Sequence, residues 1–289
     1  IDGRYYVRVG AYLDSTSAQA AQASLGLTGA TVAGTSGAGI SVVKTGTNTV
    51  LFQFDSTSGL YLAVKPGRDD TVKAETYFRG YSYFGAFEYR RNGGDITVVN
   101  VLSMDDYLQG VIVQEMSPSW PLEALKAQTV CARSYAYGKL QAGKHQSQGF
   151  DLCNTTDCQA YVGIATASDN SRRAVEETSG VYLWYNGRVA DQTVYSSHNG
   201  GASESAVNVW GRDYPYLIGK IDPYEASVVD RISNYNWTVT YTAQELTELL
   251  QSKGYGNSTI VDFRVTKTSP TGNAIEITFT DANGRSWSK

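Results

Sequence analysis

The chain has 289 residues, of which 42% are hydrophobic and 18% charged, with a formal net charge of -4. This length allows a sizeable core and one or two domains. The slight acidity and the lack of Lys/Arg runs argue against a nucleic-acid surface. No segment approaches the roughly 18 apolar residues of a membrane span. No signal peptide is recognised, and the abrupt start at Ile1 would follow if a signal or anchor had been removed.

Residues 1–75 are predicted to form a β-rich N-terminal region, separate from residues 76–289. Residues 5–13 alternate as a strand does, and a helix is expected over 17–25, capped by the Ser or Thr before it. Apolar runs between Gly/Thr/Ser-rich segments predict further strands in GATVAG, GISVV, TVLFQF and LYLAV. Since no ionisable cluster stands out here, we expect a scaffold or binding region.

Residues 77–103 predict at least two strands, joined by a turn at 92–95. A helix is predicted to begin after Ser103 and to end before Pro118. Glu115 falls on the same face of this helix as its apolar residues, so it should face the core or a cleft rather than solvent. A carboxyl group taken out of water holds its proton more tightly, as a general acid must.

A second, alanine-rich helix is predicted to begin at Pro121, where the missing N–H of proline costs nothing. Its small side chains allow close packing, so we expect it to be central. Lys126 and Arg133 are seven positions apart and share a face. Unpaired cations are costly inside a protein, and Glu115 is the acid nearest in sequence. This pattern favours either catalysis at Glu115 or an ordinary salt bridge at a helix end.

The rest of the chain alternates polar loops with short elements. A polar loop is expected over 143–160, a helix over 166–179 and a hairpin around Asn186-Gly187. A Gly/Ser-rich loop follows, then a strand and helix over 236–251 and a C-terminal hairpin. Strands are many, long helices are few and no regular βαβ alternation exists. We therefore predict an α+β fold with mixed strands around the central alanine-rich helix.

Cys153 and Cys158 lie five positions apart in the polar loop, and two interpretations of them are open. They form either a local disulfide in an oxidising compartment or half of a zinc site completed by His145 or Asp157. Cys131 is predicted to be a small buried apolar residue of the alanine-rich helix. Ser196, Ser197 and His198 stand together, but no G-x-S-x-G elbow accompanies them, which argues against a serine triad.

The segment YLQGVIVQEMSPSWPLEALKAQTVCARSYAY at 107–137 resembles the signature of the stage II sporulation protein D (SpoIID/LytB) family. The resemblance extends through RGYSYFGAFEYRRNGGDITVVNVLSMDDYL upstream and through CQAYVG, VYLWYNG and YSSHNGGASESAVNVWG downstream, roughly 77–289. It implies an extracytoplasmic peptidoglycan lytic transglycosylase, secreted or anchored at the wall or septum. Such enzymes cleave the MurNAc–GlcNAc β-1,4 bond and leave 1,6-anhydro-MurNAc ends. Sporulation members act on strands that an amidase partner has stripped of stem peptides, during engulfment.

The resemblance places the catalytic glutamate on Glu115 and supporting basic residues on Lys126 and Arg133. No second acid is needed, because the MurNAc 6-hydroxyl is the internal nucleophile, and no cofactor is needed for the chemistry. The alternative is a non-catalytic peptidoglycan-binding protein that activates a cell-wall amidase. Residues predicted to line the glycan groove are Tyr135, Gln159, Tyr161, Tyr195, Ser197 and His198.

The resemblance also bears on the metal. Some family members have a His directly before the second Cys and bind zinc through Cys and His, whereas this chain has Asp157 there. His145 could compensate. A structural zinc on Cys153, Cys158 and His145, ordering the loop at 145–161, and a disulfide both remain open.

Overall fold

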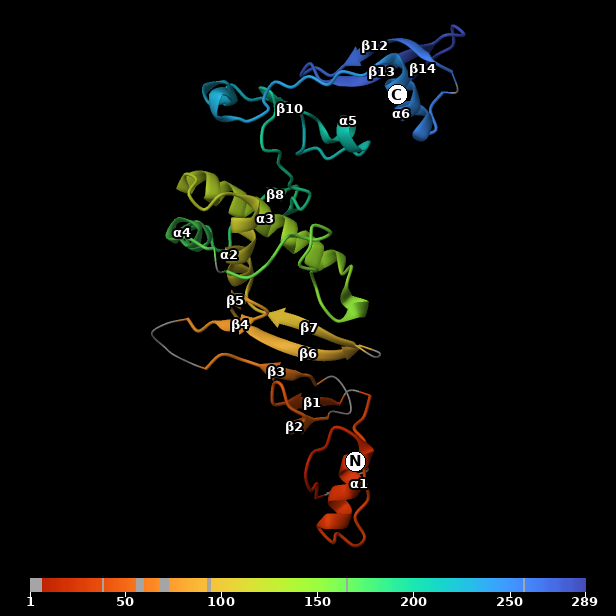
Figure 1. Cartoon of the computed structure of the whole chain (residues 1–289). Helices are drawn as coiled ribbons and strands as arrows, with labels where there is room; N and C mark the ends of the chain where they lie inside the picture. Colours follow the sequence, from red (N-terminus) through yellow and green to blue (C-terminus); the bar gives the residue numbers. More distant parts are fainter. Residues whose placement is uncertain are drawn as a thin grey trace. The chain divides into compact units, whose positions relative to one another are not determined.

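The computed structural model describes residues 7–37, 39–55, 60–67, 73–92, 95–164, 166–256 and 258–289. The chain has an α+β fold and divides into two units, Ile1–Leu183 and Trp184–Lys289 (Figure 1). The predicted boundary after residue 75 lies within the first unit and stays a prediction.

The N-terminal part of the first unit contains a helix and a small hairpin. Helix α1 (Ser15–Ser24) is capped by Asp14, whose carboxylate accepts from the Ser17 amide at 2.7 Å, rather than by a Ser or Thr. The hairpin pairs β1 (Ile40–Val43) with β2 (Val50–Phe54), as predicted. The strands expected over 7–13 and 29–34 do not form, and residues 5 and 6 lie outside the described part. Alternation is not sufficient for a strand, because its backbone groups also need a partner strand.

A three-stranded antiparallel sheet in the order β3-β6-β7 follows in the first unit. The turn predicted at 92–95 is confirmed by the pairing of Asn92 with Asp95. A short ribbon of β4 and β5 precedes the sheet's long hairpin. The bounds are β3 (Leu62–Val64), β4 (Thr76–Phe78), β5 (Tyr81–Tyr83), β6 (Ala86–Asn92) and β7 (Asp95–Val101).

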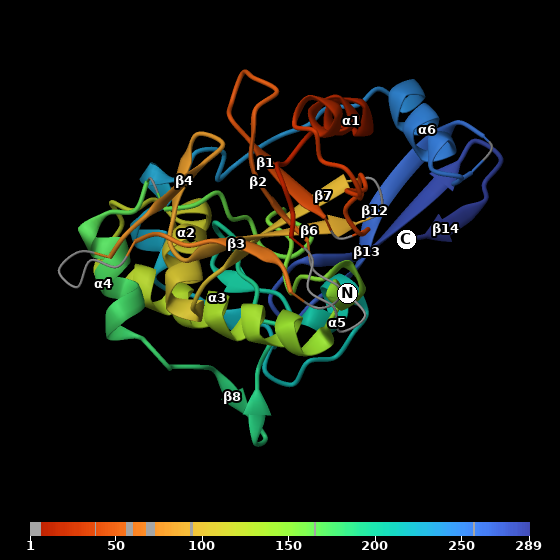
Figure 2. The ribbon, with the colours of Figure 1, turned by 90° about the horizontal axis from the view of Figure 1, so that it is seen from below.

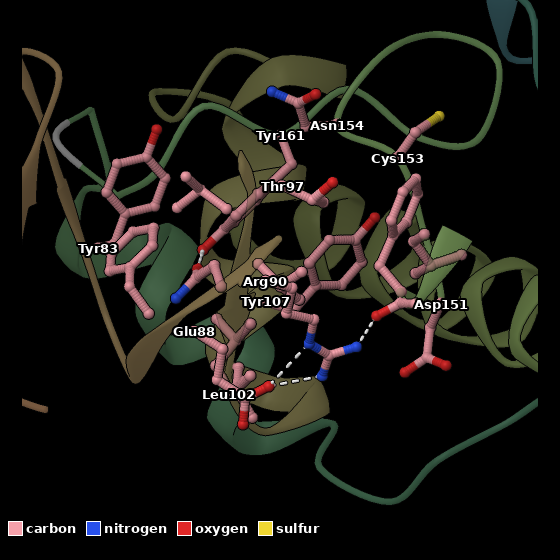
Figure 3. Close-up of a pocket in the computed structure, with 18 of the residues that line it drawn as sticks. Tyr83, Glu88, Arg90, Thr97, Leu102, Tyr107, Asp151, Cys153, Asn154 and Tyr161 are labelled. Atoms are coloured by element: carbon pink, nitrogen blue, oxygen red, sulfur yellow. Dashed lines mark hydrogen bonds and ion pairs between the residues drawn. The ribbon is translucent and has the colours of Figure 1, made fainter. Parts of the chain in front are cut away.

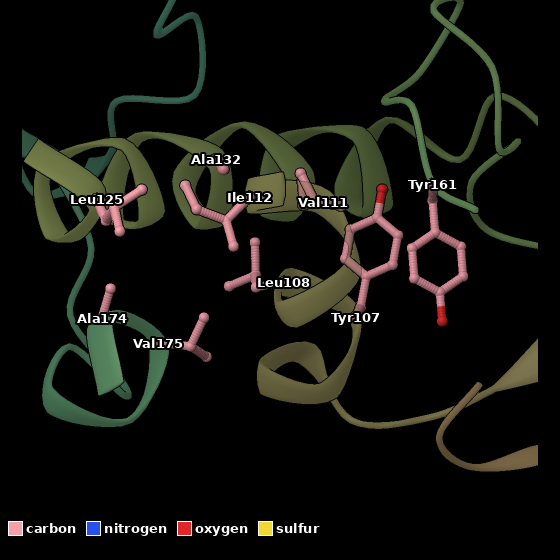
Figure 4. Packing of buried hydrophobic residues seen from close by; sticks show 10 residues of the cluster. Tyr107, Leu108, Val111, Ile112, Leu125, Ala132, Tyr161, Ala174 and Val175 are labelled. Atoms are coloured by element: carbon pink, nitrogen blue, oxygen red, sulfur yellow. The ribbon is translucent and has the colours of Figure 1, made fainter. Parts of the chain in front are cut away.

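Three helices build the core of the first unit, with α2 and α4 beside α3 (Figure 1, Figure 2). Their bounds are α2 (Met104–Glu115), α3 (Leu122–Ala142) and α4 (Asp169–Glu177). The loop after α3 contains a short 3-10 helix, η1 (Gln146–Gln148). Leu108, Val111 and Ile112 of α2 are fully buried. They meet Leu125 and Ala132 of α3, Ala174 and Val175 of α4, and the rings of Tyr107 and Tyr161 (Figure 4). The alanine-rich helix α3 is therefore central, as predicted.

The start and end of these helices follow the sequence signals. Ser103 caps α2 by accepting from the Asp106 amide at 3.2 Å, and Pro121 occupies the N-cap of α3. Gly143 ends α3 in the left-handed region, with φ of 62°. Gly110 lets a loop approach α2, because a Cβ there would lie 2.4 Å from the Tyr161 ring. These helix ends fix where Glu115 stands.

The second unit consists of short elements and one larger hairpin. Asn186 and Gly187 form the predicted turn, with φ of 48° and 78°. The strand expected over 236–242 is absent, but the helix after it forms, capped by Thr242. None of the helices in the described ranges is long and apolar enough to cross a membrane. The elements are β8 (Trp184–Tyr185), β9 (Arg188–Val189), β10 (Ala202–Ser203), α5 (Ala206–Trp210), β11 (Lys220–Ile221), η2 (Glu225–Ser227), η3 (Val229–Arg231), α6 (Ala243–Ser252), β12 (Ile260–Thr268), β13 (Ala274–Asp281) and β14 (Ser286–Ser288).

Candidate functional site

Glu115 is the last residue of α2 and is half-buried. The chain leaves the helix at Met116 and makes a turn, in which the Trp120 amide donates to the Ser117 carbonyl at 3.0 Å. The N-cap residue of α4, Ser168, donates through its hydroxyl to the Pro118 carbonyl at 3.0 Å. A buried helix on one side and a tethered turn on the other thus hold Glu115. Trp120, in this turn, is 46% exposed.

Lys126 contacts acids other than the one that the sequence predicted. Its Nζ lies 2.7 Å from Glu123 Oε1 and 2.6 Å from Glu177 Oε2. Hydrogen bonds with Glu123 and then with Glu177 raise the pKa of Lys126. Glu177 is the last residue of α4, whereas the opposite end of α4 is the one tied to the turn after Glu115. Lys126 therefore joins α3 to the far end of α4.

Arg133 is buried, with 1% of its surface exposed, and also pairs away from Glu115. It donates to Asp105 Oδ1 at 2.8 Å and to the Val181 carbonyl at 3.3 Å. Burial of Asp105 opposes its ionisation, but hydrogen bonds from Ser179 and Arg133 outweigh this and lower its pKa. Asp105 and Glu115 are ten positions apart on α2, about 15 Å of helix rise. Arg133 thus holds the beginning of α2, while Glu115 stands at its end.

The residues predicted to line a glycan groove divide between the two units. In the first unit, Tyr135 is half-buried beneath Lys139, whose Nζ lies 4.9 Å from the ring centroid. Gln159 and Tyr161 are buried. Gln159 accepts from the Tyr107 hydroxyl at 3.1 Å, and Tyr161 donates to Asn100 Oδ1 at 2.8 Å. These two polar ends are therefore used inside the fold, and their contact with a glycan stays a prediction.

Tyr195, Ser197 and His198 belong to the second unit. Tyr195 and Ser197 are exposed and His198 is half-buried. Glu225, which sequence reasoning missed, holds the loop that follows them. Its carboxylate accepts from the Asn199 amide at 2.7 Å and the Gly200 amide at 2.8 Å. No motif marks an isolated glutamate as such an anchor, so its role is visible only in the fold.

The loop after α3 gathers four possible metal ligands. One ligand atom each from His145, Cys153, Asp157 and Cys158 lie within 4.8 Å of one another. Cys158 Sγ is 3.2 Å from His145 Nε2, and Asp157 Oδ2 is 3.6 Å from the same nitrogen. Cys153 and Cys158 are free thiols rather than a disulfide.

The surroundings of the four ligands suit a metal. His145 Nδ1 lies 2.8 Å from Gln148 Oε1, a contact that orients the ring and leaves Nε2 toward the cysteines. Burial opposes ionisation of Cys153, but hydrogen bonds from Thr155 and Cys158 prevail and lower its pKa to about 7. Two thiols, one imidazole and one carboxylate make a donor set that zinc accepts. The residues present therefore fit a structural zinc ion.

The fold and site define an α+β protein with one carboxylate at a helix end and a separate Cys/His/Asp cluster. The family model for SpoIID, described as "Stage II sporulation protein", matches residues 92–185. This matched segment contains Glu115, Lys126, Arg133 and the four possible metal ligands, so the chain is similar to the SpoIID family over the part that carries both sites.

Relatives share about half of the chain. It is 39% identical over 140 residues to an uncharacterized protein of Brachyspira hyodysenteriae, covering 48% of this chain and 38% of that protein. It is 42% identical over 139 residues to the amidase enhancer of Bacillus subtilis, covering 48% of this chain and 17% of that protein. It is 27% identical over 175 residues to stage II sporulation protein D of Bacillus subtilis, covering 56% of this chain and 50% of that protein. The matched segments thus span at most half of these relatives.

Proposed function

We propose that the protein acts in the bacterial cell wall as a lytic transglycosylase, outside the cytoplasmic membrane, with Glu115 as its sole general acid/base. The substrate would be peptidoglycan glycan strands, stripped of stem peptides. The placement of Glu115 carries this proposal. It lies in the family-matched segment, half-buried at the end of a buried helix and five positions before the exposed ring of Trp120. Such a ring is a suitable platform for a sugar face.

The reaction proceeds in two proton transfers at one carboxyl group. Glu115, as the acid, donates its proton to the O4 of the departing GlcNAc while the bond between that oxygen and MurNAc C1 breaks. The resulting carboxylate then takes the proton from the MurNAc 6-hydroxyl as its oxygen bonds to C1. Glu115 is protonated again at the end, the product is a 1,6-anhydro sugar and no water is consumed. One acid is therefore sufficient.

Lys126 and Arg133 act as positioning residues in this proposal. Lys126 pairs with Glu177 at the end of α4, and Arg133 pairs with Asp105 at the beginning of α2. Both contacts fix the helices that carry Glu115 and its neighbouring turn. Their effect on cleavage would thus be exerted through the position of Glu115.

A zinc ion would be held by His145, Cys153, Asp157 and Cys158, and it would supply cross-linking of the loop rather than chemistry. None of these four side chains is needed for the two proton transfers. Asp157 replaces the histidine that the resemblance implies at this position.

A second candidate function is non-catalytic binding of peptidoglycan with stimulation of a cell-wall amidase. The likeness to a protein named amidase enhancer, at 42% identity over 139 residues, favours it. In this case Glu115 would serve only the fold or glycan binding.

The test incubates the protein with peptide-free glycan strands and analyses the products by mass spectrometry. Anhydro products, lighter by one water than hydrolysis products, are expected from the wild type. Glu115→Gln should reduce the rate at least about 100-fold, in line with loss of a general acid, without changing Tm. Glu176→Gln, at an exposed acid of α4, is the control and should retain the rate.

Three results would contradict the proposal. Reducing ends instead of anhydro ends would indicate a hydrolase. Binding of strands without any cleavage, together with faster stem-peptide release by an added amidase, would establish the second candidate function. Unchanged cleavage by Glu115→Gln would show that the acid lies elsewhere.

A further inference from the structure

A cavity of about 950 Å³ in the first unit runs beside β7 (Figure 3). Every residue from Ile96 to Leu102 lines it. Successive side chains of a strand point to opposite faces of its sheet. A cavity that touches all of them in succession therefore lies along the edge of the strand. We call it the β7-edge cavity.

The edge of β7 offers backbone groups to this cavity. β7 is an outer strand of the β3-β6-β7 sheet. Asn92 pairs with Asp95 beside a two-residue turn, and the register continues through Arg90 with Thr97 and Glu88 with Val99. Residues that flank such a turn exchange hydrogen bonds, and the pattern then alternates. Ile96, Val98 and Asn100 thus direct their N–H and C=O groups outward. An unpaired row of this kind is the template on which another strand adds.

The opposite wall of the cavity is fixed to the sheet. Phe150, Asp151 and Leu152 belong to this wall. Arg90 of β6 donates to the Gly149 carbonyl and, through Nε, to Glu88 Oε2 at 3.1 Å. The wall is therefore held at a set position before any ligand binds, which reduces the entropy that binding must overcome.

Aromatic rings contribute much of the cavity lining, together with polar and charged side chains such as Glu88, Arg90 and Thr97. Rings that contribute are Phe78, Tyr83, Phe87, Tyr107, Phe150 and Tyr161. Burial raises the pKa of the Tyr107 and Tyr161 phenols, so both stay neutral. Pockets for alternate apolar side chains beside a row of backbone groups are the two elements of strand addition.

An acid and a base line the β7-edge cavity at different positions. The exposed Asp151 lies two positions after Gly149. The Gly149 carbonyl accepts from Arg90, and Arg90 pairs with Thr97 in the sheet. The exposed Arg79 follows Phe78 directly. The ring of Phe78 lies 4.9 Å from the ring of Phe87, and Phe87 pairs with Asn100 in the sheet. A segment lying along β7 would therefore meet an acid near Thr97 and a base near Asn100.

We infer that the β7-edge cavity binds an extended segment of a partner protein, which adds to β7 as a fourth strand. Its alternate apolar side chains enter the cavity, with a basic residue toward Asp151 and an acidic residue toward Arg79. A polypeptide fits this row because its own N–H and C=O groups alternate at strand spacing, whereas the amides of a glycan are single acetamido groups on its sugars. Glu115 does not line this cavity, and the inference does not depend on the proposed cleavage.

The test pans the full chain against a phage library of random heptapeptides and measures the best peptides by fluorescence anisotropy. Enrichment of alternating apolar sequences with one basic and one acidic end is expected. N-methylation of alternate amides on the strand-facing side should weaken binding at least 10-fold. Val98→Pro removes an outward N–H without removing a hydrogen bond to β6, and it should also weaken peptide binding at least 10-fold. Val261→Pro, at a bulge of the edge strand β12, is the matched control.

Several outcomes would overturn the inference. No enriched heptapeptide, or undiminished binding after N-methylation on both sides, would exclude strand addition. Competition by chitotetraose would identify a sugar site instead. Self-association of the chain that Val98→Pro abolishes would identify a second copy as the occupant. If Val98→Pro does not fold, the N-methylated peptides on the wild type decide the question alone.

Discussion

Arg133 donates a 2.8 Å hydrogen bond to Asp105, and this pair joins the middle of α3 to the first turn of α2. The arginine is almost completely buried, whereas the aspartate is 38% exposed. Removing the acid would leave a buried cation without compensation, which is more costly than removing both charges. The pair thus sets the stability of the helix that ends at Glu115.

Asp105→Ala is therefore expected to lower the free energy of unfolding by about 3 kcal/mol. Arg133→Met should lower it less, and the double variant should be more stable than Asp105→Ala alone. Urea unfolding measures these differences. If Asp105→Ala unfolds like the wild type but the folded protein has lost cleavage, the pair acts in the reaction rather than in the fold.

The metal site gives a second prediction. Protein purified without chelator is expected to contain about one zinc per chain by elemental analysis, because four donors of suitable type lie together. Cys153→Ser and His145→Ala should each abolish this content. Cys131→Ser is the control, since that residue lies on α3 outside the cluster. A full zinc content in Cys153→Ser, or two thiols missing from a metal-free protein, would contradict the assignment.

Local signals in the sequence predicted the helices of the first unit better than they predicted its contacts. Ser103 and Pro121 mark where α2 and α3 begin, because caps depend on neighbouring residues alone. Lys126 contacts Glu123 of α3 and Glu177 of α4, and Arg133 contacts Asp105 at the other end of α2, and sequence proximity alone indicated none of these contacts. The cluster of His145, Cys153, Asp157 and Cys158 could be predicted as a possible zinc site because its four residues are close in sequence. Glu225 was missed because its partners lie about 25 residues away.

Glu204 makes the second unit sensitive to acid. Hydrogen bonds from Ser269, then from Asn208 and Asn273, lower its pKa well below the ordinary value of 4.5. Its folded pKa is thus below its unfolded pKa, so the unfolded state binds more protons as the pH falls. The stability that Glu204 contributes is present above about pH 4.5 and declines below it. Glu204→Gln should flatten the fall in urea midpoint between pH 6 and pH 3. An unchanged slope would contradict this role.

Glu225 is expected to determine the order of the loop that carries Ser197 and His198. Its carboxylate accepts from the Asn199 and Gly200 amides, and hydrogen bonds to a charged group contribute about 1.5–3 kcal/mol. Glu225→Ala should therefore increase hydrogen exchange at these two amides at least about 10-fold, because 1.4 kcal/mol corresponds to a factor of 10. Asp222→Ala is the matched control and should have a smaller effect. It removes the 3.0 Å contact to the Asn199 side chain and the 3.0 Å bond from the Tyr224 amide, but leaves both hydrogen bonds from the loop amides to Glu225. Gly200 and Gly201 have φ of 70° and 95°, a backbone conformation that glycine adopts without strain. If the loop contacts the glycan, the same variant should raise KM for strands with kcat nearly unchanged, since Glu225 takes no part in proton transfer. Equal exchange in Glu225→Ala and wild type would show that the loop is held by other contacts.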